Sequence, residues 1–352
     1  MSLNRWNAAQ LEGFASEILK SHAMPEPHAE IAARSLVDGD LIGVATHGLS
    51  RLPSYVERLH RKLVNAKPNL HAEKGMPWSV RIDADNAMGA IAADFAVSHV
   101  RSMVESIGIG AAVVRGSNHF GTAGYHARNL AGDDCIGICL SPASKSLAPF
   151  GSREPLFGTN PWAVAVPAGR HPHWTLDMAT SVAARGHIRI AAKEGKPIPE
   201  GWALDADGNP TTDAAKALAG VMLPFAGPKG SGIAMMIDIL GGVLSGSGFG
   251  GSIRDMNTDF EAPQNVGHFF MAFRIDAFMK TMEFNARMEE LIDILRSLKP
   301  AQNHTEITYP GELEWRRKQV NLADGVPLTS IIAASLKKIG ADTGVEFPPF
   351  IR

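Results

Sequence analysis

Two short segments place a histidine among small and polar residues that could do chemistry. Thr46 to Arg51 contains His47, and Gly116 to Tyr125 contains His119. Histidine titrates near neutral pH, so each ring is a candidate proton donor or acceptor. The Arg51 guanidinium could hold a carboxylate through two hydrogen bonds, so the first segment could bind a molecule and also move its proton. The alternative interpretation is structural, with turn histidines bonded to backbone and a solvated arginine.

The elements around His119 predict how it is positioned. The apolar run 111–114 is typical of a strand, and residues 125–131 are typical of a helix. Ser117 and Asn118 are types that cap helices, so we expect His119 at or near a helix N-terminus with glycines on both sides. Free backbone N–H groups at such a point favour an anion.

Strands and helices alternate through the middle of the chain. Strands are predicted at 78–83, 110–115 and 136–140, with helices at 87–106 and 125–131 between them. This order favours the α/β class. The first seventy-odd residues and the end of the chain carry helical patterns. The most apolar run, 233–244, is too short to span a bilayer and contains Asp238, so it predicts a buried helix.

Composition limits the possible partners and compartments. Of 352 residues, 45% are hydrophobic and 20% are charged, with a net charge of −2 and no long run of one sign, which indicates neither nucleic acid nor a membrane as a partner. Cys135 and Cys139 would share one face of a strand, so they predict core residues and no metal site. Two cysteines exclude a disulfide framework and favour a reducing, cytoplasmic compartment.

The sequence carries no nucleotide-binding motif that identifies a cofactor. No Gly-x-Gly-x-x-Gly follows a strand and opens a helix, so the Rossmann fingerprint is missing. Lys229 and Gly230 begin the apolar helix and suit an anion, but they lack the spacing of a Walker loop. The long loop 141–161 has predicted strands on both sides, which favours an ordered, functional loop.

Several sequence blocks together resemble the malate/L-lactate dehydrogenase type 2 family, also called the sulfolactate-dehydrogenase-like group. They are Thr46-His47-Gly48 with Arg51-Leu52 and Tyr55, Ser117-Asn118-His119-Phe120-Gly121, Gly158-Thr159-Asn160-Pro161, Leu176-Asp177-Met178-Ala179-Thr180-Ser181, Pro199-Glu200-Gly201-Trp202-Ala203-Leu204-Asp205 with Gly208, and Pro228-Lys229-Gly230. The resemblance runs in order from about residue 5 to residue 340.

This resemblance implies a fold and a domain division. We expect a non-Rossmann α/β fold with a central mixed β-sheet and flanking helical domains. Residues 1–75 together with about 310–352 would form a helical N/C-terminal domain. Residues 76–309 would form the dinucleotide-binding sheet domain, with an inserted helical subdomain at about 180–250.

The resemblance also implies an activity and a set of site residues. The family uses NAD or NADP to transfer a hydride between nicotinamide and a small 2-oxo or 2-hydroxy acid, in a homodimer whose active site is completed at the interface. Matched positions make His47 and His119 the proton-transfer residues and Arg51 the carboxylate anchor. The matched dinucleotide contacts are Asp177, Met178, Ala179, Lys229, Gly230, Pro310, Gly311 and Glu312.

Lys145 leaves the identity of the substrate open. The run Ser141 to Ser146 departs from the usual family pattern, and its lysine is similar to that of the family's cyclic-imine reductases. Lys145 could bind a substrate carboxylate, or it could be solvated at the loop surface. The alternatives to a 2-hydroxy-acid dehydrogenase are therefore a reductase of piperideine-2-carboxylate or pyrroline-2-carboxylate, and a non-catalytic binding protein. The choice between NAD and NADP stays open, as does which of the two histidines is the proton donor.

Overall fold

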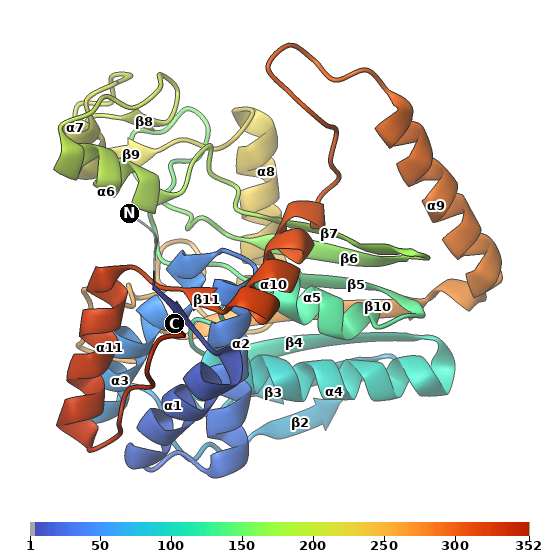
Figure 1. Ribbon diagram of the computed structural model, residues 1–352, viewed down its shortest axis with the longest axis horizontal. Helices are drawn as coiled ribbons and strands as arrows, with labels where there is room; N and C mark the ends of the chain where they lie inside the picture. The colour runs from blue at the N-terminus through green and yellow to red at the C-terminus, as the bar shows by residue number, and fades with distance from the viewer. Residues whose placement is uncertain (1–3, 352) are drawn as a thin grey trace.

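A seven-stranded mixed sheet forms the centre of the computed structural model, which describes residues 4–351 (Figure 1). The strand order is β2-β3-β4-β10-β5-β6-β7. Its strands are β2 (His71–Lys74), β3 (Ser79–Asp83), β4 (Ile109–Ser117), β5 (Cys135–Leu140), β6 (Trp162–Ala168), β7 (His171–Met178) and β10 (Val266–Arg274). Only β3 and β4 run parallel among these neighbours. The predicted α/β class and central mixed sheet are confirmed.

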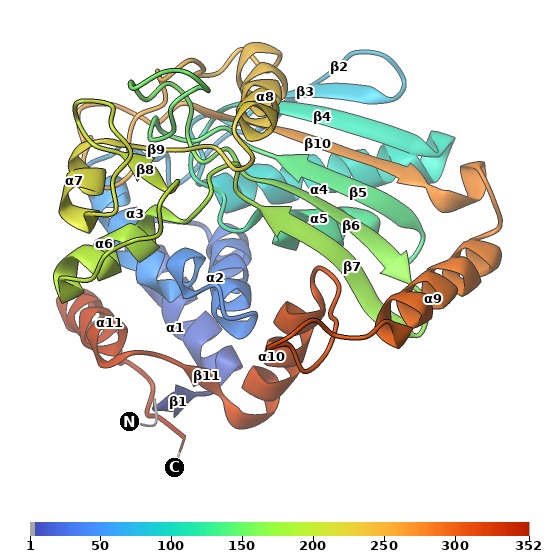
Figure 2. The same cartoon turned by 90° about the horizontal axis from the view of Figure 1, so that it is seen from above.

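Helices α4 (Gly89–Ile107) and α5 (Ala123–Ala131) cover one face of this sheet, as Figure 2 shows. Both helices present alanines to the strands, which lets helix and sheet approach closely. Ala96 and Ala127 are completely buried, as is Phe270 on β10. Cys135 and Cys139 are free and lie in the same core, as their spacing predicted.

A helical part lies beside the sheet and joins both ends of the chain. It contains α1 (Ala8–Ser21), α2 (Glu26–Leu41), α3 (Leu52–His60), α10 (Glu312–Asp324) and α11 (Ser330–Thr343). The short strand β1 (Arg5–Trp6) pairs antiparallel with β11 (Val326–Pro327), so the two lie side by side (Figure 2). The Asn7 side chain accepts a hydrogen bond from Gln10 N at 3.1 Å and begins α1. The domain boundaries given above stay a prediction.

A small lobe packs beside the sheet around its own apolar cluster. It comprises α6 (Arg185–Glu194), β8 (Ala203–Leu204), α7 (Ala214–Ala219) and β9 (Val221–Met222). Ile188 of α6 is 1% exposed and anchors that helix to Leu147 and Phe157 of the long loop. The loop is thus ordered, as predicted, because its apolar residues complete the core of the lobe.

The apolar run 233–244 is not the fully buried helix that its composition suggested. Helix α8 (Pro228–Ile237) continues into a π-helical turn (Asp238–Val243), and only one face packs inside through Ala234, Ile237 and Asp238. On the opposite face Met235 is 54% exposed and Leu244 57%. The prediction was wrong because apolar residues on both faces of a helix do not reveal what covers the outer face.

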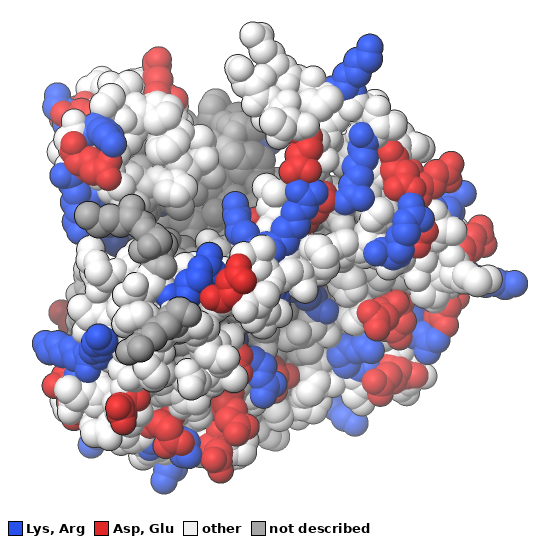
Figure 3. Space-filling model, in the orientation of Figure 1, with Lys and Arg blue, Asp and Glu red and all other residues white. Residues whose placement is uncertain are grey.

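The surface carries mixed charge. Figure 3 shows Lys and Arg side chains interspersed with Asp and Glu over the face in view. Helix α9 (Thr281–Ser297) extends along the end of the sheet, with apolar residues at its surface (Figure 1). Within residues 4–351, no helix is long and apolar enough to cross a membrane.

Candidate active site

A cavity of about 1070 Å³ lies where the helical part, the sheet and the small lobe meet. His47, Arg51 and His119 all line it, although the sequence separates the histidines by 72 positions. Five of the predicted dinucleotide contacts line the same cavity: Asp177, Met178, Ala179, Pro310 and Gly311. The structure therefore brings the two histidine segments and the candidate cofactor segments around one space.

The His47 turn folds around the carboxylate of Asp40. Leu49 N donates to Asp40 Oδ2 at 2.7 Å, and Asp40 itself is 3% exposed. A Cβ atom on Gly48 would lie 2.3 Å from the Asp40 carboxyl group, so only glycine allows this close approach. Asp40 on α2 thus holds the turn that presents His47 and Arg51.

The His119 segment rests on the first turn of α4. A Cβ on Gly89 would lie 2.2 Å from Asn118 O and 2.4 Å from His119 O, so the backbones are in direct contact. The Asn118 side chain donates to Ala87 O at 2.8 Å and secures the segment. His119 N donates to Gln264 Oε1 at 3.2 Å from the opposite side.

Ser117 and Asn118 do not cap a helix, which corrects the sequence-based expectation. Helix α5 begins at Ala123 after Thr122, so His119 precedes the helix by four residues. Ser117 Oγ instead lies 2.9 Å from Nε2 of buried His268. The polar side chains of Ser117 and Asn118 thus serve as hydrogen-bond partners inside the protein, where buried polar groups require them.

The ring of His119 has its proton on Nε2. Tyr55 Oη lies 2.7 Å from His119 Nδ1, and Gly121 N–H points to the same nitrogen at 3.4 Å. A backbone N–H can only donate, so Nδ1 accepts and Nε2 carries the hydrogen in the neutral ring. His47 stacks on this ring, with centroids 5.4 Å apart and an interplanar angle of 27°.

Both histidines are neutral at pH 7. Burial lowers the pKa of His47 to about 4, and the nearby Arg51 charge acts in the same direction. Burial also holds the pKa of His119 well below its ordinary value, with further contributions from His47 and Arg51. Two stacked imidazoles beside an arginine cannot both carry a charge at low cost.

Arg51 is oriented by the turn that carries it. Its Nε donates to Thr46 O at 2.5 Å, which leaves both terminal nitrogens for a ligand. Burial lowers its pKa, while Tyr55 and Asp255 act in the opposite direction. An arginine stays charged under these conditions, so it suits a carboxylate bound in the cavity.

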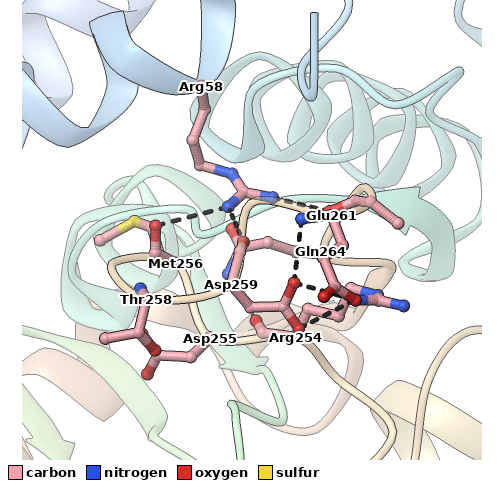
Figure 4. A network of polar contacts seen from close by, with 9 residues as sticks. Arg58, Arg254, Asp255, Met256, Thr258, Asp259, Glu261 and Gln264 are labelled. Carbon is pink, nitrogen blue, oxygen red and sulfur yellow. Dashed lines mark hydrogen bonds and ion pairs between the residues drawn. The ribbon is translucent and has the colours of Figure 1, made fainter. Parts of the chain in front are cut away.

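A loop from Arg254 to Gln264 closes this side of the cavity and is held by buried Arg58 of α3 (Figure 4). Arg58 donates to the carbonyl oxygens of Met256 at 3.4 Å, Asp259 at 2.9 Å and Ala262 at 3.2 Å. Three carbonyl acceptors on one guanidinium fix the course of the loop.

The predicted dinucleotide segments meet at the other end of the cavity. Asp177 Oδ2 accepts from Gly124 N at 2.8 Å, near the start of α5. Gly311 has φ +90, and its Cβ would lie 2.9 Å from Thr175 Cβ, so glycine permits its contact with β7. The buried Oγ1 atoms of Thr122 and Thr175 have no partner among the described residues, and both threonines line the cavity.

Four of the predicted site residues do not line the cavity in the single chain. Lys145 is exposed, and Lys229 is exposed at the start of α8. Gly230 is buried, and a Cβ atom at this position would lie only 2.2 Å from Phe225 O. Glu312 is 2% exposed and binds Arg296 and Arg316, each at 2.6 Å, so it ties α9 to α10.

Several polar residues that line the cavity had no predicted role. They are Arg185, Arg189, Asp255 and Gln264. Arg185 and Arg189 lie four positions apart in a helix, a spacing that places them on one face, and this signal was visible in the sequence. Asp255 and Gln264 come from an irregular loop, where no periodicity indicates direction. In the described part of the chain, no three His, Cys, Asp or Glu side chains are grouped to hold a metal ion.

Comparison with known proteins identifies the family. The L-sulfolactate dehydrogenase of Methanocaldococcus jannaschii is 36% identical over 335 residues, covering 95% of this chain and 96% of that protein. Its solved structure superposes with a TM-score of 0.91 and covers 98% of each chain. The (2R)-3-sulfolactate dehydrogenase (NADP(+)) of Chromohalobacter salexigens is 36% identical and covers 80% of this chain and 86% of its own. The ureidoglycolate dehydrogenase (NAD(+)) of Escherichia coli O157:H7 is 32% identical and covers 87% of both. The profile of the malate/L-lactate dehydrogenase family matches residues 6–337, so the chain belongs to this family, as its sequence blocks predicted.

Proposed function

We propose that this protein is an NAD(P)-dependent oxidoreductase that transfers a hydride between nicotinamide and C2 of a small 2-oxo or 2-hydroxy acid. One observation carries the proposal: His47, Arg51 and His119 line the same cavity as Asp177 to Ala179 and Pro310–Gly311. The former could bind and protonate a small acid, and the latter could hold a dinucleotide. Relatives whose names specify NADP(+) or NAD(+) support the cofactor class.

The described residues fit a dinucleotide. The cavity volume of about 1070 Å³ lies just above the range of roughly 300–1,000 Å³ for ligand pockets, which suits a ligand as large as a dinucleotide together with a small acid. The buried hydroxyl groups of Thr122 and Thr175, which have no protein partner, are placed to bond a ribose or phosphate. Asp177 to Ala179 and Gly311 would hold the dinucleotide beside them. When bound, the nicotinamide supplies or accepts the hydride.

Arg51, His119 and His47 divide the remaining work. Arg51 binds the substrate carboxylate and fixes C2 in the cavity. His119 directs Nε2–H towards the substrate oxygen, where it stabilises negative charge as the carbonyl is reduced. In the oxidation direction His47 accepts the hydroxyl proton, because Nε2 of neutral His119 already carries a hydrogen. The His47 ring, stacked on His119, excludes water from the pair and can share the positive charge that proton uptake brings.

The placement of Lys145 favours an oxo acid over a cyclic imine. Lys145 is exposed, and its Cδ lies near Gly251 on the loop surface. No lysine stands beside Arg51 at the substrate end of the cavity in the described residues. A non-catalytic role is disfavoured because Asp40 and Gly89 build precise supports for the two histidine segments.

We also infer a homodimer in a reducing, cytoplasmic compartment. The outer face of α8 presents Met235, Leu244 is exposed just after the π-helical turn that continues this helix, and Lys229 lies at the start of α8. Burying this face against a second copy would remove an apolar surface from water and could bring Lys229 to an active site. The compartment is supported by the free thiols of Cys135 and Cys139. Light scattering should give twice the chain mass, and Leu244→Glu should weaken the association.

Initial rates of NADH and NADPH oxidation with 2-oxo acids and the two cyclic imines test the activity. Arg51→Met should reduce kcat/KM by about 2–5 kcal/mol of transition-state stabilisation, mainly through KM for the acid. Arg81→Met removes an exposed arginine paired with Glu73 and serves as the control. Turnover of no acid or imine, together with no dinucleotide binding in a thermal-shift assay, would refute the enzyme assignment.

A further inference from the structure

The end of the cavity that lies farther from the histidines is lined by helix α10 and carries an acidic side chain, Glu314. We propose that Glu314 selects NAD over NADP, because its carboxylate can accept hydrogen bonds from ribose hydroxyl groups and would repel a 2′-phosphate. The inference rests on the function proposed above and specifies which of the two dinucleotides the protein uses.

The position of the substrate site sets the direction of the dinucleotide. Arg51 and His119 line one end of the cavity, and hydride transfer requires the nicotinamide beside them. The rest of the dinucleotide must then extend towards the end lined by β7 and by the start of α10. These two elements are in direct contact, since a Cβ on Gly311 would lie 2.9 Å from Thr175 Cβ. The adenosine half of the cofactor therefore meets α10.

The polar groups available at this end suit a neutral diol. Thr175 is 7% exposed, and its Oγ1 has no hydrogen-bond partner among the described residues. Glu314 lies in the first turn of α10 and lines the cavity, and its charge acts on Asp177 of β7. A carboxylate only accepts hydrogen bonds, whereas a hydroxyl both donates and accepts. The two ribose hydroxyl groups of NAD can satisfy both kinds of partner.

The cations at this end are already bound to a carboxylate. Two Lys or Arg side chains line it in the described part of the chain, Arg128 of α5 and Lys318 of α10. Arg128 binds Oδ2 of Asp38 and Lys318 binds Oδ1, each at 2.6 Å. The Asp38 side chain is 5% exposed, so solvent screens these ion pairs little. A phosphate group would have to compete with Asp38 for either cation.

The other charged groups near Glu314 do not offset its charge. Burial lowers the pKa of His173, so this ring is neutral at pH 7. Asp177 can add only negative charge. Arg317 pairs with Glu314 at 3.5 Å, but its side chain is 54% exposed, and an exposed pair of this kind is weak. A 2′-phosphate would thus meet a carboxylate, with the nearby cations of residues 4–351 bound elsewhere or solvated.

Calorimetric titration with NADH and with NADPH tests the assignment without turnover. The wild-type dissociation constant should be at least about ten-fold lower for NADH. Glu314→Gln removes the negative charge and should strengthen NADPH binding about ten-fold, while NADH binding weakens. Asp38→Asn releases Arg128 and Lys318 and should also shift the ratio of the two constants towards NADPH. Asp324→Asn, an exposed change at the end of the same helix, is the control.

Each contrary result has a distinct meaning. Tighter binding of NADPH by the wild-type protein would overturn the proposal and leave the proposed activity intact. An unchanged ratio of the two constants in Glu314→Gln would remove Glu314 from the ribose site and overturn the proposal as well. The preference for NADH should also shrink as the salt concentration rises, because salt screens charge repulsion, and a preference that salt does not change would contradict this cause. Failure to bind either dinucleotide, with no turnover of any acid, would instead refute the proposed activity.

Discussion

The hydroxyl of Tyr55 lies 2.7 Å from Nδ1 of His119 and donates its hydrogen to that nitrogen. Burial raises the pKa of Tyr55, so the phenol stays protonated at all working pH values. Gly121 N–H points to the same nitrogen and fixes the direction of the bond. Tyr55 therefore sets the tautomer of His119, which lines the cavity, although the ring of Tyr55 itself is buried behind that histidine.

Replacing Tyr55 by phenylalanine should lower kcat about ten-fold, which is the loss of one hydrogen bond of about 1.4 kcal/mol in the transition state. The pKa of His119 should rise, because Nδ1 would lose the donor that favours the neutral ring. The acid limb of the pH profile should therefore move upward. Tyr125→Phe, which removes a hydroxyl outside the cavity, is the matched control. An unchanged kcat and pH profile would contradict this role.

The lowered histidine pKa predicts an unusual pH profile for oxidation of a 2-hydroxy acid. The accepting ring must be neutral, so activity is lost as the pH falls through its pKa in the folded protein. Burial places that value near 4 for His47 and well below the ordinary value for His119. We expect kcat/KM to stay level from pH 8 to pH 6, because this parameter reports the free enzyme. A half-point near the ordinary histidine value of about 6.5 would show that the rings are more solvated than their burial indicates.

The sequence predicted the elements well where periodicity was strong and the site well where residue blocks were long. Strand β5 was expected at 136–140 and is Cys135–Leu140, because alternating side chains mark a half-buried strand. His47, Arg51 and His119 were placed in one site through the family resemblance. Residue spacing alone could not bring them together, because the contacts depend on tertiary packing.

Other features required coordinates. The contacts of Gly48 with Asp40 and of Gly89 with Asn118 join segments far apart in sequence, and no local pattern encodes them. Ser117 has a side chain of a type that caps helices, but its hydroxyl instead forms a hydrogen bond with the buried ring of His268. The outer face of α8 could not be called exposed from its composition, since its apolar residues cover both sides of the helix.

Asp40 makes the stability of the protein depend on pH. Burial raises its pKa to about 7, although the N–H of Leu49 acts to lower it. The folded state thus holds a proton between about pH 4 and pH 7 that the unfolded state releases, so this carboxyl group lowers stability as the pH rises through that range. Asp40→Asn cannot ionise. The wild-type protein should therefore lose about 3 kcal/mol of unfolding free energy, relative to the Asp40→Asn variant, when the pH is raised from 5 to 8.

Urea unfolding at the two pH values measures this difference. Asp342→Asn changes an exposed carboxylate on α11 and should show no comparable pH dependence. A difference between Asp40→Asn and wild type that is the same at pH 5 and pH 8 would show that Asp40 has an ordinary pKa in the folded protein.

The Arg58 contacts in Figure 4 couple the stability of the protein to the geometry of its site. Arg58→Lys keeps the positive charge, but a single ammonium group cannot reach the carbonyl groups of Met256, Asp259 and Ala262 together. Leaving buried carbonyl groups without donors should cost about 2–4 kcal/mol of unfolding free energy, measured by urea denaturation. The loop also carries Gln264, which accepts from His119 N, so kcat/KM should fall about ten-fold as the histidine loses its support. Arg81→Lys, which changes an exposed arginine on β3 that pairs with Glu73, should change neither quantity by more than about 0.5 kcal/mol. Full activity in a destabilised Arg58→Lys protein would separate the two effects and show that the loop holds His119 without the arginine.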